Sequence, residues 1–298
     1  MLTHLNTEPV LPSRVVILGA GGFISSAAQR KIEENNIPVL ALTQAMLDLT
    51  HKNASDRLAS LLLANDVLLF VAAIAPVKSE AMLIENLRIG ETVCNALRKI
   101  AVGHVIYISS DAVYADSNTP LTERSCAQPG SLHGIMHLAR EVMLANAWHG
   151  PLCFLRPTLI YGKDDPHNGY GPNRFLRLAV NGEEIVLFGE GEERRDHVWV
   201  EDVAELLIRV LIHRSTGILN IATGNVMSFR EIAELVARLT GHSPNIKSTP
   251  RIGPMPHNGY RPFNIESTYL AFPDFRYTFL SEGLRSIADS DSILEKLN

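Results

Sequence analysis

Two histidines four residues apart, His133 and His137 in the segment GSLHGIMHLARE (130–141), are the side chains of this sequence best placed for chemistry. On a helix, positions i and i+4 lie one above the other on the same face, so the two imidazoles would be neighbours. Such a pair can exchange protons with a substrate, contribute to a metal site, or form a satisfied structural pair. A metal site needs at least one further ligand, and the sequence does not indicate one.

The elements that would position this pair form a regular series in the first half of the chain. Helical patterns alternate with short β-rich runs that are apolar on both faces, which favours a parallel sheet covered by helices on both sides. Strands are predicted at 14–18, 38–42, 66–73, 104–110 and 152–157, and helices up to about 35 and at 54–64, 79–100 and 131–147. This order predicts a doubly wound, Rossmann-like α/β fold.

The second half of the chain has a different sequence pattern. The segment GKDDPHNGYGPNR (162–174) is dense in Gly, Pro, Asn and Asp and predicts a loop. Strands predicted at 197–200 and 218–222 are expected to return to the first sheet. Ser228 and Glu231 form a capping box for a helix over 228–241, and a loop-rich tail ends in a short helix. We therefore expect a cofactor-binding domain at 1–165, interleaved with a smaller C-terminal α/β substrate lobe at 166–298.

The overall composition and charge limit the classes of partner that we expect. A formal net charge of −5 gives no reason to expect nucleic acid or an anionic membrane surface. The longest apolar run, at 67–77, has 11 residues and is too short to span a bilayer. Three cysteines suggest no disulfide framework, and the first dozen residues do not resemble a signal peptide. A cytoplasmic protein is the expectation.

A glycine-rich turn opens the predicted fold. In VVILGAGGFIS (15–25), Gly19 permits the tight turn after the first strand, and Gly22 lets the backbone approach a pyrophosphate at a helix N-terminus. Ser25 occupies the third glycine position. At the end of the second strand, Thr43 stands where an acidic residue would bind the ribose 2′-hydroxyl of NAD, and no arginine is there for a 2′-phosphate. The pattern predicts NAD or NADP without choosing between them.

Several motifs occur in an order that resembles the extended short-chain dehydrogenase/reductase family, which comprises nucleotide-sugar epimerases, dehydratases and reductases. They are the glycine turn, LDLT (47–50), VAAIA (71–75), NLRIGETVCNAL (86–97), YISSDAVY (107–114) and ERRDHVWVEDVAEL (193–206). The resemblance extends from about residue 14 to 283. It implies a cofactor bound by residues of the turn, of the second and third strands and of the strand ending at 157, namely Gly19, Gly22, Phe23, Ile24, Thr43, Asp48, Leu49, Ala72 and Pro157.

The resemblance also assigns the reacting end of the site. Ser110 matches the family's catalytic Ser/Thr, which donates a hydrogen bond to the reacting substrate oxygen. Asp111 follows it as in the dehydratases, but their glutamate is replaced by Ala112, which disfavours a dehydratase. The family's YxxxK dyad falls on His133 and His137, so both members are replaced by histidine.

This replacement leaves the chemistry open. A histidine has an ordinary pKa near ~6.5, against ~10 for tyrosine, so His133 needs no tuning to act as a base at neutral pH. His137 then retains the option of a hydrogen bond to the nicotinamide ribose. The resulting hypothesis is an NAD(P)-dependent epimerase or oxidoreductase of a nucleotide-linked sugar. The alternatives are a catalytically degenerate binding protein with a regulatory or partner role, a metal clip, and a structural histidine pair.

The substrate lobe carries three further candidates implied by the resemblance. Arg195 and Arg261 match arginines that bind the diphosphate of a nucleotide sugar, and Asn173 matches a sugar- or phosphate-contacting asparagine. Surface exposure for the arginines and helix capping for Asn173 are the competing interpretations. Members of the family often dimerise through two helices per subunit, so a homodimer is among the expected assemblies.

Overall fold

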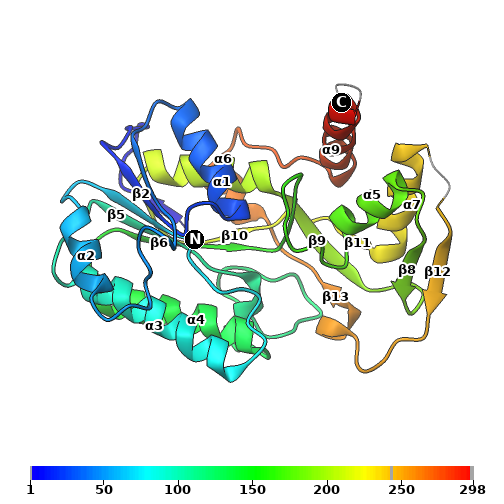
Figure 1. Ribbon diagram of the computed structural model, residues 1–298, viewed down its shortest axis with the longest axis horizontal. Helices are drawn as coiled ribbons and strands as arrows, with labels where there is room; N and C mark the ends of the chain where they lie inside the picture. The colour runs from blue at the N-terminus through cyan, green and yellow to red at the C-terminus, as the bar shows by residue number, and fades with distance from the viewer. Residues whose placement is uncertain (1, 242–243, 296–298) are drawn as a thin grey trace.

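The computed structural model describes residues 2–241 and 244–295, which form a larger and a smaller lobe (Figure 1). The larger lobe contains a seven-stranded sheet. In spatial order its strands are β1 (Leu2–His4), β10 (Ser215–Ile221), β6 (Leu152–Pro157), β5 (His104–Ile108), β4 (Val67–Phe70), β2 (Val15–Leu18) and β3 (Val39–Leu42). Neighbouring strands are parallel except for β1, which pairs antiparallel with β10. The predicted doubly wound sheet is confirmed.

The strand order reverses at β2, because the next two strands of the chain lie on opposite sides of it. β3 pairs with one edge of β2, and the chain then returns to place β4 on its other edge. In open α/β sheets, the point where the strand order reverses leaves a crevice at the carboxyl ends of the strands, and ligands bind there. The glycine turn follows β2 directly and therefore lies at this crevice.

Helices cover both faces because the side chains of β2 and β4 are apolar on both sides of the sheet. In β2, Val15 and Ile17 pack into one core cluster, while Val16 and Leu18 pack into the other. The first cluster contains side chains of α1 (Phe23–Glu34) and α6 (Val200–Ile212). The second contains side chains of α2 (Ala54–Leu61), α3 (Glu80–Leu97) and α4 (Leu132–Ala147).

The smaller lobe contains two small sheets and a separate core. One sheet consists of β7 (Leu159–Tyr161), β9 (Arg194–Trp199), β11 (Val226–Ser228) and β13 (Tyr260–Arg261), and the other of β8 (Ile185–Phe188) and β12 (Ile246–Thr249). Side chains of α5 (Pro172–Val180), α7 (Phe229–Thr240) and α9 (Leu280–Glu295) contribute to its core. The short elements are η1 (Asp111–Val113), η2 (Pro256–Gly259) and α8 (Glu266–Ala271). The predicted capping box of α7 is present, with Ser228 Oγ accepting from the Glu231 amide.

Two expectations need correction, and one strand was not foreseen. Only one of the two predicted returning strands joins the large sheet: β10 pairs with β6, whereas β9 pairs with β7, β11 and β13 in the smaller lobe. A short buried strand carries no signal of which sheet will receive it, because that depends on partners distant in sequence. The edge strand β1 was not predicted, and the final helix, α9, spans 16 residues rather than being short.

Among the described residues, no helix is long and apolar enough to cross a membrane.

Candidate active site

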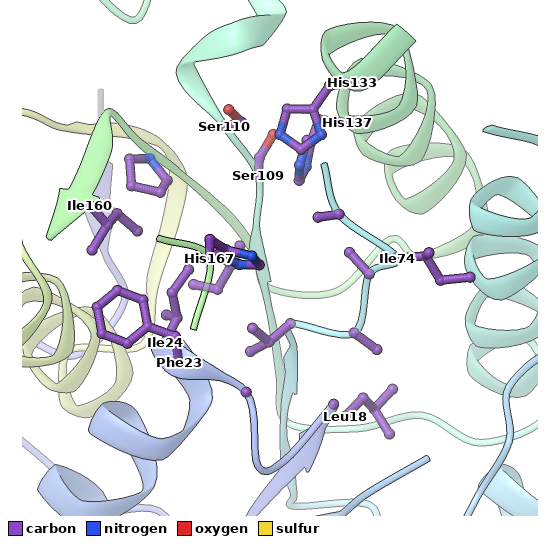
Figure 2. A pocket seen from close by; sticks show the side chains of 18 of the residues that line it. Leu18, Phe23, Ile24, Ile74, Ser109, Ser110, His133, His137, Ile160 and His167 are labelled. Atoms are coloured by element: carbon purple, nitrogen blue, oxygen red, sulfur yellow. The ribbon is translucent and has the colours of Figure 1, made fainter. Parts of the chain in front are cut away.

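A cavity of about 670 Å³ lies at the carboxyl ends of β2, β4 and β5 and extends to the smaller lobe (Figure 2). This volume is in the usual range for a small-molecule site. Its wall contains the glycine turn, the segment after β4, the first turns of α4, and residues from the smaller lobe. The crevice expected from the strand order is therefore an open, lined cavity.

The glycine turn is shaped by backbone contacts that exclude a side chain. Gly19 has φ +89°, and a Cβ there would lie 2.6 Å from the Ala72 Cα. Gly22 precedes α1 in an extended conformation, and its amide donates to Ser25 Oγ at 2.9 Å. Ser25 Oγ in turn donates to the Gly19 carbonyl at 2.8 Å, so the serine at the third glycine position closes the turn. The N-terminus of α1 lines the cavity through Gly22, Phe23 and Ile24, and helix N-termini of this kind bind phosphate.

Most of the residues expected to bind the cofactor line this cavity. They are Gly19, Gly22, Phe23, Ile24, Asp48, Leu49, Ala72 and Pro157. Thr43 does not line it; the next residue, Gln44, does. Asp48 is exposed, and its Oδ1 accepts from the Thr50 amide and hydroxyl, which lowers the pKa of the carboxyl. Its side chain is therefore an anionic acceptor at neutral pH, at the expected adenine end.

The end of the cavity that is expected to face the reacting part of a substrate is formed where η1 meets the start of α4. Ser110 is the N-cap of η1, and its Oγ accepts from the Ala112 amide at 3.1 Å. Ser131 caps α4 by accepting from the Gly134 amide. Gly134 fits tightly against η1, because a Cβ at that position would lie 2.0 Å from the Ala112 carbonyl oxygen. This contact brings His133, one residue earlier, to the cavity wall on the same side as Ser110, as Figure 2 shows.

His133 and His137 both line the cavity, with ring centroids 4.7 Å apart and ring planes 86° apart. Burial lowers the pKa of His133; the Asp111 carboxylate raises it and the Arg140 guanidinium lowers it. Its Nδ1 is buried and has no hydrogen-bond partner among the described residues. The pKa of His137 lies well below the ordinary value, chiefly because of burial. Both rings are therefore neutral at pH 7.

A buried polar layer supports α4 from behind. Glu141 binds Arg156 through both carboxylate oxygens and accepts from Ser109 Oγ at 2.6 Å. Arg156 also donates to Tyr114 at 2.8 Å. These contacts tie α4 to β5 and β6, so the histidine-bearing helix is held on the sheet by charged groups with partners rather than by apolar packing alone.

The three substrate candidates occupy different positions. Arg195 lines the cavity, with Glu193 Oε1 at 3.3 Å from its Nη1. Asn173 is buried outside the cavity wall, where it bonds the Gly162 amide and Asp165. Arg261 is also outside the wall, with its guanidinium directed onto Asp111 and Asp116. Of the three, only Arg195 faces the space where a substrate would lie.

Several cavity residues were not singled out by the sequence. Asp165 and His167 belong to the segment interpreted only as a loop, and His257 precedes Arg261 near the cavity. His197 lines a neighbouring cavity of about 250 Å³ that also contains Arg195. Both His197 ring nitrogens are buried without a partner in the described chain, and burial lowers its pKa to about 3. The alternation of β9 places His197 on the same side as Arg195, which was the available signal.

The hypothesis that His133 and His137 bind a metal ion requires at least one further ligand. Within residues 2–241 and 244–295, no group of three or more His, Cys, Asp or Glu side chains is arranged to hold a metal ion. His137 Nδ1 is instead taken by the hydroxyl of Tyr107, at 2.8 Å.

Comparisons with known proteins agree with this architecture. Residues 15–222 match the model of the NAD dependent epimerase/dehydratase family. The chain is 27% identical over 273 residues to a UDP-N-acetyl-alpha-D-glucosaminuronate decarboxylase of Bacillus cytotoxicus, covering 86% of this chain and 82% of that protein.

Two solved structures share the fold. The UDP-glucose 4-epimerase of Thermus thermophilus in complex with NAD superposes with a TM-score of 0.82 and 23% identity, covering 93% of this chain and 98% of that one. The Thermotoga maritima UDP-glucose 4-epimerase with UDP-glucose gives a TM-score of 0.84 and 20% identity, covering 96% and 100%. The fold, the glycine turn at the switch point and the match over most of the chain agree, so this protein belongs to the NAD dependent epimerase/dehydratase family.

Proposed function

We propose that this chain is an NAD(P)-dependent epimerase or oxidoreductase of a nucleotide-linked sugar, with His133 as the acid/base group. The observation that carries the proposal is the meeting of Ser110 and a neutral His133 on the wall of one cavity, beyond a turn shaped for a dinucleotide. The family membership and the UDP-sugar enzymes that share the fold support the substrate class.

The cavity residues fit a dinucleotide at one end. The tight turn at Gly19 leaves no room for a Cβ, and the N-terminus of α1 lines the same cavity. The backbone amides that follow Gly22 at the start of α1 would hold the pyrophosphate, and Asp48 would lie near the adenosine. When bound, the cofactor would accept a hydride from the sugar carbon and return it.

The chain's own groups would handle the proton. As the C–H bond of the sugar gives up its hydride, a neutral His133 takes the hydroxyl proton, and the carbon becomes a carbonyl. Ser110 donates a hydrogen bond to that oxygen and fixes its position. The proton on His133 then returns to the oxygen when hydride comes back to carbon. Arg195, on the smaller lobe, would bind the diphosphate.

The first experiment is mass spectrometry of small molecules released from the purified protein on denaturation, followed by titration with NAD and NADP. Bound or titratable cofactor supports the proposal, and incubation with UDP- and GDP-linked sugars then tests turnover by product analysis. A protein that carries no cofactor and binds neither NAD nor NADP would contradict it.

The second candidate is a binding protein without this chemistry. It is favoured by the absence of a cationic group at position 137, where the ring is buried and neutral. The two candidates differ in one result: a degenerate protein binds NAD(P) or the nucleotide sugar but releases no altered sugar.

We also propose a homodimer. Ile135 and Val142 lie seven residues apart on one face of α4 and are 41% and 62% exposed, and Ile84 of α3 is 51% exposed. α3 and α4 run side by side along the lower edge of the larger lobe in Figure 1. Light scattering should give twice the chain mass; a monomeric mass would contradict this assembly.

A further inference from the structure

A buried tyrosine of the large sheet contacts the second histidine of the pair. Tyr107, on β5, is fully buried, and its hydroxyl oxygen lies 2.8 Å from Nδ1 of His137. His137 is 6% exposed, and its ring forms part of the cavity wall. With Nδ1 occupied by Tyr107, only Nε2 is left to meet a ligand.

The direction of this hydrogen bond follows from the tyrosine's alternatives. Besides His137, the nearby acceptor for the Tyr107 hydroxyl in the described chain is Met136 Sδ, at 3.9 Å. A thioether is a weak acceptor, whereas an unprotonated imidazole nitrogen is a good one. If Nδ1 donated to Tyr107, the buried hydroxyl hydrogen would be left with the sulfur, at a cost of about 1–3 kcal/mol for a poorly satisfied buried donor. The hydroxyl therefore donates, and Nδ1 accepts.

We propose that Tyr107 is a positioning residue that holds His137 as the tautomer carrying its hydrogen on Nε2. In this state His137 presents a hydrogen-bond donor from the cavity wall. The use of that donor, a hydrogen bond to the ribose hydroxyl beside the nicotinamide, rests on the proposed function. The tautomer itself does not, because it is fixed by protein groups alone.

The surroundings also keep the ring uncharged, which the assignment of one tautomer requires. Arg140 lies three residues further along α4 and is fully buried. Its guanidinium donates hydrogen bonds to uncharged oxygens, namely the Asn86 carbonyl and side chain and the Ala72 carbonyl. A cation without a carboxylate partner in those bonds disfavours a second positive charge nearby. The lowered pKa of His137 agrees with this arrangement.

The proposal separates two roles that a lysine combines. A lysine at position 137 would supply both a donor and a positive charge. The Tyr107–His137 pair supplies the donor, while the charge stays on Arg140 below the cavity wall. His133 therefore works beside a neutral neighbour, and its capacity to accept a proton is not weakened by an adjacent imidazolium.

The test is long-range proton–nitrogen NMR on full-length protein labelled with ¹⁵N-histidine, with His137→Gln used to assign the signals. The wild-type protein should show His137 Nδ1 as an unprotonated nitrogen and Nε2 as a protonated one. In Tyr107→Phe, Nδ1 loses its donor, and both His137 signals should move toward a mixture of tautomers. The Kd for NAD should rise about two- to tenfold, as expected for one neutral hydrogen bond.

Tyr161→Phe is the matched control. Tyr161 is equally buried, and its hydroxyl has no partner among the described residues, so its removal should leave the His137 signals and the NAD affinity unchanged. A wild-type spectrum with the hydrogen on Nδ1, or an unchanged His137 spectrum in Tyr107→Phe, overturns the proposal. The wild-type spectrum decides even if the variant folds poorly. If the protein binds no NAD(P), the proposed function fails while the spectra still decide the tautomer.

Discussion

The two ends of the main cavity are built on different principles. The cofactor end depends on backbone: a left-handed glycine, a close approach to Ala72 and the N-terminus of α1. The proposed reacting end depends on side chains from the start of η1 and from α4, and His133 and His137 are predicted to stand where the family has its tyrosine and lysine. A binding site made of backbone atoms requires small residues at its closest contacts but depends little on the identity of the other side chains. A site made of side chains changes its chemistry when one of them is substituted. If the predicted replacement of the dyad holds, cofactor binding can therefore persist although the reacting side chains differ.

The sharpest way to break this comparison is to remove the base. In His133→Ala, kcat should fall by about 10²–10⁴-fold, the usual contribution of a general acid/base, while the Kd for NAD(P) stays within about twofold. Steady-state rates and binding titration measure the two quantities. His149→Ala is the control, because His149 is exposed and outside the cavity. Unchanged turnover in His133→Ala would remove His133 from the mechanism.

Alanine substitutions at two glycines test the cofactor end of the cavity. Gly19 and Gly21 both have positive φ, but an added Cβ meets the Ala72 backbone at 2.6 Å only at Gly19 and open space at Gly21. Alanine at either position costs about 1–2 kcal/mol in backbone strain. Gly19→Ala should in addition weaken NAD(P) binding by about 10- to 100-fold, because the turn must move. Equal affinities in the two variants would show that the close approach to Ala72 is not needed.

The arginines of β9 sharpen the comparison on the substrate side. Arg195 lines both cavities, whereas the neighbouring Arg194 is exposed and outside them. Arg195→Gln should raise KM for a nucleotide sugar by about tenfold, since a charge-assisted hydrogen bond contributes about 1.5–3 kcal/mol. Arg194→Gln should leave KM unchanged. If both variants behave alike, the diphosphate binds elsewhere.

The smallest effect concerns pH. His133 must be neutral to accept a proton, and its pKa is lowered by burial and by Arg140 against the opposing effect of Asp111. As pH falls, kcat/KM should therefore decline only below the ordinary histidine value of about 6.5. The affinity for NAD(P) should change less over the same range, because the backbone amides of the turn do not titrate. A decline centred above pH 6.5 would contradict this assignment of the base.

The sequence predicted the fold well where local patterns carry the information. Strand–turn–helix at Gly19 and Gly22, the α/β alternation and the capping box at Ser228 all depend on short-range geometry or periodicity. It predicted less well where an element chooses a distant partner. β9 was expected in the large sheet and lies in the small one.

The site shows the same division. That His133 and His137 share a helix face, and that Ser110 follows a strand, is readable from spacing. Spacing does not show that Arg261 is directed onto Asp111, which lies 150 residues away in sequence. Nor does it show that the Asn173 side chain accepts a hydrogen bond from the Gly162 amide. The roles of Asn173 and Arg261 in binding substrate remain predictions, and both would require their present partners to be exchanged for a ligand.

The sequence by itself determined a glycine turn between a strand and a helix, a parallel sheet and two imidazoles on one face of a helix, because sterics and periodicity act within a few residues. Only the tertiary structure decided what those imidazoles meet. Tyr107 reaches His137 from another element, Gly134 presses α4 onto η1, and Arg140 brings a buried charge beneath them. Such contacts follow from the packing of whole elements, which sets distances that no local pattern records.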